Sequence, residues 1–428
     1  MTSRRGNPTR PGYGNKNAMI AAGLLLAAAV VLRPMARTRA AQGGPQTSTY
    51  TVLFNFAGMD GSLPNAGVIA DGAGNLYGTT FQGGAYGYGT VYELPATGGE
   101  TVLYSFTGAS DGALPYAPVL RDAAGNLYGA AGQGGTFNST CPHGCGVIFK
   151  VTPQGKERVL YSFTGGADGY QPISNLVRDA EGNLYGDTIA GGITSSCVVG
   201  GYVGCGVVFK LSKAGAETVL YSFTGESDGW GPGFGLARDV AGNLYGVTQA
   251  GGDLSSCSGG GCGVVFKLDL AGNETVLYSF TGGLDGWAPE AGLTMDAEGN
   301  LYGTAPMGGD FSCGVGYGCG VVFEVDSTGN ETTLYTFTGP GGEAPVGGLV
   351  RDALGSLYGT AAQGGTSNDG VIFELAASGK EYVLHSFSGA DGALPVASLL
   401  AYKGTLYGTT YEGGSGGEGD GVLFKITP

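Results

Sequence analysis

The chain has 428 residues, of which 88 are glycine, 42% are hydrophobic and only 13% are charged. The glycines follow no three-residue period, which excludes collagen, and the apolar content is too high for a disordered chain. Acidic residues outnumber basic ones by 35 to 20, so the protein would repel nucleic acid and anionic lipid.

Residues 1–40 differ from the rest of the chain. Four basic residues precede an apolar run over 18–32, and small residues follow up to Ala40. This layout is typical of a secretory signal peptide. The alternative is an uncleaved N-terminal anchor, although the run is shorter than the roughly 20 residues that span a bilayer. Removing residues 1–40 takes away seven basic and no acidic residues and leaves a net charge of −22. We therefore expect an extracytoplasmic protein, either secreted or held at the cell surface or in the periplasm.

After a short linker over 41–48, one pattern repeats to the end of the chain. Copies of Gly-Asn-Leu-Tyr-Gly recur at intervals of 49–60 residues, which indicates a tandem repeat. Their tyrosines are Tyr77, Tyr128, Tyr185, Tyr245, Tyr302, Tyr358 and Tyr407.

Each repeat contains four short β-type segments, which in the third repeat cover 159–163, 175–179, 183–187 and 206–211. They are rich in β-branched and aromatic residues and bounded by turn residues. No sustained helical period occurs, so we expect few helices. Asp-x-x-Gly-Asn between the second and third segments predicts a hairpin.

Four antiparallel strands in seven repeats predict an all-β fold, a seven-bladed β-propeller of four-stranded blades in a single domain over 49–428. The segment 50–56 resembles the first segment of a repeat, and 421–426 resembles the last. We therefore predict that the N-terminal strand completes the C-terminal blade and closes the ring.

The motifs L-Y-S-F-T-G, D-x-x-G-N-L-Y-G and G-V-V-F-K, in this order and seven times over, resemble the GloVer (Gloeo/Verruco) tandem repeat of choice-of-anchor exported proteins. The similarity covers about residues 48–428. It implies an extracytoplasmic repeat protein and supplies no catalytic residues.

Eight cysteines fall in pairs between the third and fourth segments of repeats 2 to 5. An even number in equivalent loops of an exported chain predicts local disulfides, whereas the irregular spacing argues against zinc. The predicted pairs are Cys141–Cys145, Cys197–Cys205, Cys257–Cys262 and Cys313–Cys319.

An Asp-Gly pair follows the first segment of most repeats, on the face that also carries the cysteine loops. A ring of such carboxylates suits Ca²⁺, and the candidate ligands are Asp111, Asp168, Asp228 and Asp285. The alternative, which turn chemistry favours, is that each aspartate caps its own turn. Glu343 lies near the corresponding position of the sixth repeat.

The residue after Asp-Gly is aromatic only in repeats 3, 4 and 5, as Tyr170, Trp230 and Trp287. Such rings suit stacking on sugars or anchoring a protein partner. The alternative is that they pack between blades.

These patterns predict a monomeric binding or structural module that recognises a polysaccharide or a surface protein through the loops of repeats 3–5. No cofactor is expected beyond the weak case for Ca²⁺. The alternative function is a carboxylate-based hydrolase or lyase acting on extracellular polysaccharide.

Overall fold

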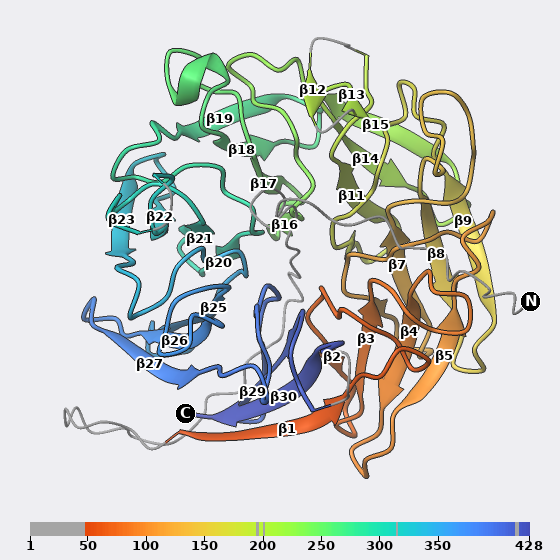
Figure 1. Ribbon diagram of the computed structural model, residues 1–428. Helices are drawn as coiled ribbons and strands as arrows, with labels where there is room; N and C mark the ends of the chain where they lie inside the picture. The colour runs from red at the N-terminus through yellow and green to blue at the C-terminus, as the bar shows by residue number, and fades with distance from the viewer. Residues whose placement is uncertain (1–47, 194–196, 200–201, 314–315, 416–418) are drawn as a thin grey trace, which may run out of the picture.

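The computed structural model describes residues 48–428 apart from 194–196, 200–201, 314–315 and 416–418. The expected signal segment 1–40 and residues 41–47 lie outside the described residues. Seven four-stranded antiparallel sheets form a ring, as Figure 1 shows. This confirms the predicted seven-bladed propeller. We call the four strands of a blade a, b, c and d from the axis outward.

Each blade begins with a short strand a next to the axis and a longer strand b. The a strands are β2 (Ile69–Ala70), β6 (Leu120–Arg121), β10 (Val177–Arg178), β16 (Ala237–Arg238), β20 (Thr294–Met295), β24 (Val350–Arg351) and β28 (Leu400–Tyr402). The b strands are β3 (Leu76–Thr80), β7 (Leu127–Ala131), β11 (Leu184–Thr188), β17 (Leu244–Thr248), β21 (Leu301–Ala305), β25 (Leu357–Ala361) and β29 (Thr405–Thr410).

Strand c is buried and strand d forms the rim of the ring. The c strands are β4 (Thr90–Leu94), β8 (Val147–Val151), β14 (Val207–Leu211), β18 (Val264–Leu268), β22 (Val321–Val325), β26 (Val371–Leu375) and β30 (Val422–Thr427). The d strands are β5 (Thr101–Ser105), β9 (Glu157–Ser162), β15 (Glu217–Ser222), β19 (Glu274–Ser279), β23 (Glu331–Thr336), β27 (Glu381–Ser386) and β1 (Thr49–Asn55).

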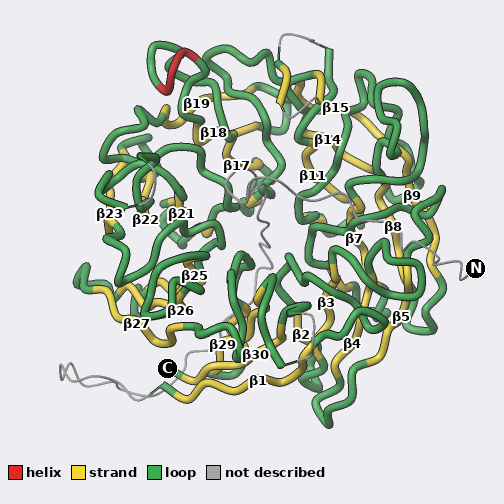
Figure 2. Tube along the Cα trace, viewed as in Figure 1, coloured by secondary structure: helices red, strands yellow, loops and turns green. Residues whose placement is uncertain are grey.

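The elements outside the blades are small. A two-stranded hairpin, β12 (Val198–Val199) and β13 (Tyr202–Val203), and one 3₁₀ turn, η1 (Cys257–Gly259), lie in loops between strands b and c. Loops and turns make up much of the tube in Figure 2. Among the described residues, no helix is long and apolar enough to cross a bilayer.

Strand a is shorter than the sequence predicted. The expected segment 175–179 forms ladder bonds only at Val177 and Arg178, which face Tyr185 and Leu184. The residues before it belong instead to the connection from the previous blade, where Ser174 and Asn175 are buried.

The N-terminal strand closes the ring, as predicted. Strand β1 pairs antiparallel with β30 from Thr49 opposite Thr427 to Asn55 opposite Val422. Strands β1 and β30, from the two ends of the described chain, lie side by side in Figure 1, with red β1 along blue β30. The last blade thus combines one strand from the N-terminal end with three from the C-terminal end, so its c strand, like those of the other blades, is paired on both sides.

A repeated pair of aromatic rings joins each blade to the next. The buried phenylalanine after strand d of one blade meets the ring on strand c of the following blade, for example Phe106 against Phe149 with centroids 5.0 Å apart. The glycine of Leu-Tyr-Gly makes room for this ring, because a Cβ at Gly129 would lie 2.5 Å from Phe149. The repeat motif therefore encodes the contact between blades.

Candidate functional site

The two longer connections of each blade emerge on one face of the ring, which we call the loop face. These are the b–c loop within a blade and the d–a loop that leads to the next blade, and isolated β-bridges join them, such as Tyr170 to Ala190 and Trp287 to Met307. The a–b and c–d turns form the opposite face, the hairpin face. The predicted sharing of a face by the Asp-Gly turns and the cysteine loops is confirmed.

The cysteines pair as predicted, and no cysteine is free. Each disulfide closes the b–c loop of one blade among blades 2 to 5. The bond packs on the glycine that follows strand d in the same blade, since a Cβ at Gly225 would lie 2.2 Å from Cys197 Sγ. Four disulfides indicate an oxidising, extracytoplasmic environment.

The aspartates of the Asp-Gly turns each accept hydrogen bonds from the blade that precedes the turn. Asp111 accepts hydrogen bonds from the Tyr104 hydroxyl at 2.8 Å and from the backbone N–H and hydroxyl of Thr107 at 2.8 and 2.5 Å. Burial alone would raise the pKa of Asp111, but these bonds outweigh it and hold the pKa below its usual range.

The same bonds recur in the next three blades, at Asp168, Asp228 and Asp285. The turn-capping role is therefore present in all four. No group of three or more potential metal ligands occurs among the described residues. A role in binding Ca²⁺ remains a prediction.

The sixth repeat departs from the expected alignment. Gly341 occupies the aspartate position, and Glu343 occupies the position of Trp287, since Glu343 bridges to Gln363 as Trp287 does to Met307.

The three aromatic residues after Asp-Gly differ in exposure. Tyr170 is only 3% exposed and belongs to the main core cluster. Trp230 is partly buried, and its indole N–H donates to the Gly260 carbonyl at 3.4 Å. The ring of Trp287, also partly buried, is tilted against Tyr317 with centroids 5.9 Å apart. Their contact with a ligand remains a prediction.

A set of exposed apolar side chains, not singled out in the sequence, lies on the b–c loops of blades 1 to 5. We call it the apolar crescent; its members are Tyr86, Tyr88, Phe137, Ile193, Val203, Leu254, Phe311 and Tyr317. Phe137 and Phe311 are each 50% exposed. The b–c loops of five consecutive blades thus present large apolar side chains to solvent.

A glycine pair fixes the loops that carry the crescent. The second glycine donates its N–H to the d–a loop of the preceding blade, as Gly135 does to the Ala109 carbonyl at 2.8 Å. A Cβ at the first, Gly134, would lie 2.6 Å from Gly112 Cα. Four crescent residues follow the second glycine by two positions: Tyr86, Phe137, Leu254 and Phe311. This spacing is the sequence signal that could have found them.

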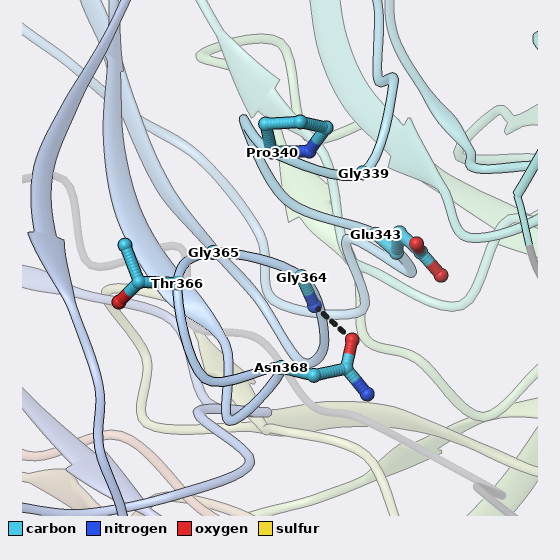
Figure 3. Close-up of a pocket in the computed structure, with 7 residues that line it drawn as sticks. All are labelled: Gly339, Pro340, Glu343, Gly364, Gly365, Thr366 and Asn368. Carbon is cyan, nitrogen blue, oxygen red and sulfur yellow. Dashed lines mark hydrogen bonds between the residues drawn. The ribbon is translucent and has the colours of Figure 1, made fainter.

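The b–c loop of blade 6 is polar at the same place. Thr366 and Asn368 line an open depression of about 380 Å³ together with Pro340 and Glu343. Asn368 folds back and accepts a hydrogen bond from the Gly364 N–H at 3.1 Å, as Figure 3 shows. The apolar surface therefore does not continue into blade 6.

Two buried carboxylic acids were also missed. Asp187 on β11 and Glu290 in the d–a loop before blade 5 are 1% and 2% exposed, and burial raises the pKa of each to about 7. Asp187 occupies a position where four other blades have a threonine whose hydroxyl donates a hydrogen bond to the next blade. Thr79, for example, donates to the Ala117 carbonyl at 2.9 Å. In the sequence, the signal for Asp187 was that an acidic residue replaces this repeated threonine.

The fold and its loops define the class of this molecule as a disulfide-stapled seven-bladed β-propeller. The chain belongs to the Gloeobacter/Verrucomicrobia repeat family, which it matches over residues 42–199 and 194–424. A comparison with curated protein sequences found no significant match.

Several solved structures share the architecture at low identity. Virginiamycin B lyase from Staphylococcus aureus has a TM-score of 0.54 at 11% identity, covering 89% of this chain and 99% of the lyase. The extracellular domain of a one-component system protein from B. thetaiotaomicron has a TM-score of 0.53 at 9% identity, covering 89% of this chain and 40% of that chain. A gluconolactonase from Xanthomonas campestris has a TM-score of only 0.44 at 14% identity, covering 90% of each chain. At such identities the likeness supports the fold alone.

Proposed function

We propose that the protein is a secreted or surface-located binding module that holds an extracellular polysaccharide on its loop face. The single observation that carries the proposal is the apolar crescent. Large apolar side chains are exposed on the same face of five consecutive blades, and apolar surface that gathers on one face is typical of interaction sites.

The chemistry of the crescent favours sugar rings as the ligand. Tyr86, Tyr88, Phe137, Phe311 and Tyr317 are aromatic, and flat rings stack on the apolar faces of sugars. The aromatic side chains lie on blades 1, 2 and 5, and Ile193 and Leu254 add aliphatic side chains on blades 3 and 4. This row suits an extended chain that contacts one loop after another.

The rigidity of the loops supports the same function. Disulfides close the b–c loops of blades 2 to 5, and the glycine pairs bond these loops to their neighbours. A surface that is ordered before binding loses less conformational entropy when the ligand arrives.

The test is a binding screen with insoluble and soluble neutral polysaccharides on the mature chain, followed by variants. We expect the double variant Phe137→Ala and Phe311→Ala to weaken binding about tenfold or more, because stacking contacts contribute about 0.5–1.5 kcal/mol each beyond their buried area. The matched control is Val240→Ala with Leu354→Ala, which removes exposed apolar side chains from the hairpin face. Equal loss in both variants, or no binding to any polysaccharide, would count against the proposal.

The enzymatic alternative stays a prediction. Asp187 and Glu290 have a pKa near 7, which suits acid–base chemistry, but both are buried in the resting structure. Hydrolysis or elimination products released from a bound polysaccharide, and lost in Asp187→Asn, would favour it.

A further inference from the structure

A second candidate site lies on the hairpin face, between blades 2 and 3. A partly enclosed cavity of about 180 Å³ opens there, with Leu160, Leu184, Leu211 and Tyr128 among its lining residues. The same cavity is lined by four basic side chains and by no acidic one: Lys150, Arg158, Arg178 and Lys213. In a mature chain with a net charge of −22, such a cluster is unexpected.

Strand pairing places two of these cations next to each other. Lys150 on β8 lies directly opposite Arg158 on β9. Side chains opposite each other in antiparallel strands share a face of the sheet, and like charges in this arrangement are destabilising. In the other six blades the residue opposite this position of strand c is a threonine or a tyrosine, never a cation.

The neighbouring blade supplies the other two cations. Arg178 at the end of β10 and Lys150 both lie over the Tyr128 ring, at 5.8 and 5.5 Å from its centroid. Lys213 belongs to the c–d turn of blade 3. None of the four forms an ion pair within 4.0 Å among the described residues. Asp122, the aspartate of the a–b turn of blade 2, accepts hydrogen bonds from Asn126 and Tyr128 instead.

Two of the other junctions between neighbouring blades balance this charge with acidic residues. Between blades 1 and 2, Arg121 takes the place of Arg178 and pairs with Asp71 at 3.8 Å. Glu93 replaces Lys150 there and accepts a hydrogen bond from Tyr77 at 3.1 Å.

The seam between blades 5 and 6 repeats the pattern. Arg351 approaches Asp296 at 4.0 Å, and Glu324 accepts from Tyr302 at 3.3 Å. Relative to these two junctions, the one between blades 2 and 3 lacks the glutamate and has three more cations. A lysine also replaces the glutamate in blades 3, 4 and 7, as Lys210, Lys267 and Lys425, so Arg158 and Lys213 are the cations that distinguish this junction.

We propose that this cavity binds the carboxylate- or sulfate-bearing unit of an acidic sugar. The four cations bind the anionic group, and the leucine side chains contact the apolar face of the ring. The cavity is smaller than the roughly 300–1,000 Å³ of pockets for drug-sized ligands, so it takes one unit of a chain. Distant acidic residues oppose this little, because salt screens charges beyond about 8 Å at physiological ionic strength. The site is independent of the proposed function, since it lies on the opposite face.

The test measures binding of tetragalacturonate to the mature chain by calorimetry, beside maltotetraose, tetraglutamate and sodium sulfate. The variant is Arg158→Thr with Lys213→Ala, which installs the residues found at these positions in other blades, such as Thr101 and Ala377. The control, Lys380→Ala with Lys403→Ala, removes two cations that do not line the cavity. Circular dichroism verifies that both variants are folded.

We expect tetragalacturonate to bind most tightly, the variant to weaken it about tenfold or more, and the control to change it less than about twofold. Binding should also weaken with added salt. The proposal is overturned if tetragalacturonate does not bind, if the variant binds like the parent, or if maltotetraose, tetraglutamate or sulfate binds as tightly.

Discussion

The closure of the ring rests on a seam that differs from the others, and Tyr50 is its centre. Tyr50 on β1 stacks on His385 of β27 with centroids 3.8 Å apart and planes 2° apart. Its hydroxyl donates to the Asp391 carbonyl at 2.6 Å, and its ring also contacts Phe387 and Phe424. This one side chain therefore ties the N-terminal strand to both blade 6 and blade 7.

Truncating Tyr50 should loosen the closure. An aromatic-to-alanine change at a fully buried site costs about 3–5 kcal/mol, and Tyr50 is half-buried, so we expect Tyr50→Ala to lower the free energy of unfolding by about 2–3 kcal/mol. Tyr50→Phe keeps the aromatic stack and loses only the hydrogen bond, so we expect it to lower the free energy of unfolding by about 1 kcal/mol.

The assay is urea unfolding at constant pH, with hydrogen exchange of peptides from 49–56 and 422–427. We expect faster exchange in both segments in Tyr50→Ala, because β1 and β30 exchange ladder bonds. The matched control is Tyr161→Ala, which removes a rim tyrosine that bonds Asp168 within a blade not formed from both chain ends. Unchanged exchange in 422–427, or an unfolding free energy within about 0.3 kcal/mol of the parent, would refute the reasoning.

Three further predictions concern charge and covalent closure. Burial and the nearby Asp168 raise the pKa of Glu217 to about 7. Because the folded state then holds this proton more tightly than the unfolded state, the contribution of Glu217 to stability is fully present below about pH 4.5 and is lost as the pH rises through 7. Stability should therefore fall between pH 5 and pH 8, and Glu217→Gln should flatten the profile by at most about 1 kcal/mol because the group is half exposed; a profile equal to that of the parent would contradict this. Asp187→Thr should raise the free energy of unfolding at pH 8 by about 2–4 kcal/mol and change it much less near pH 5, and destabilisation at pH 8 would exclude the buried-charge explanation. Denatured, unreduced protein should contain no free thiols, and Cys257→Ser with Cys262→Ser should cost about 2 kcal/mol in thermal unfolding, whereas eight titratable thiols would exclude the disulfides.

The features that recur in every repeat could be predicted from the sequence. The Leu-Tyr-Gly motif gave strand b and its glycine, and the copy of a first segment at 50–56 predicted the pairing of β1 with β30. Local cysteine pairs predicted the disulfides, since their short separations allow few other partners. These features depend on local spacing and on the count of repeats.

The features that depend on exposure or on neighbouring blades could not be predicted as well. Tyr170 and Phe137 are both loop aromatics, yet the first is buried and the second is half exposed, and only the packing of adjacent loops decides this. The four cations of the basic cavity come from two blades and lie up to 63 positions apart, from Lys150 to Lys213. Alignment of the repeats identifies these cations as exceptions only once the contact between blades 2 and 3 is known.

The measurement that tests the binding account most directly is hydrogen exchange of residues 41–428 with and without the tightest neutral polysaccharide fragment from the screen. We predict slower exchange in the b–c loops 81–89, 132–146 and 249–263, and no change in the hairpin-face turns 239–243 and 352–356. Protection confined to the hairpin face, or to the polar loop of blade 6, would contradict the assignment of the loop face and its apolar crescent as the binding surface.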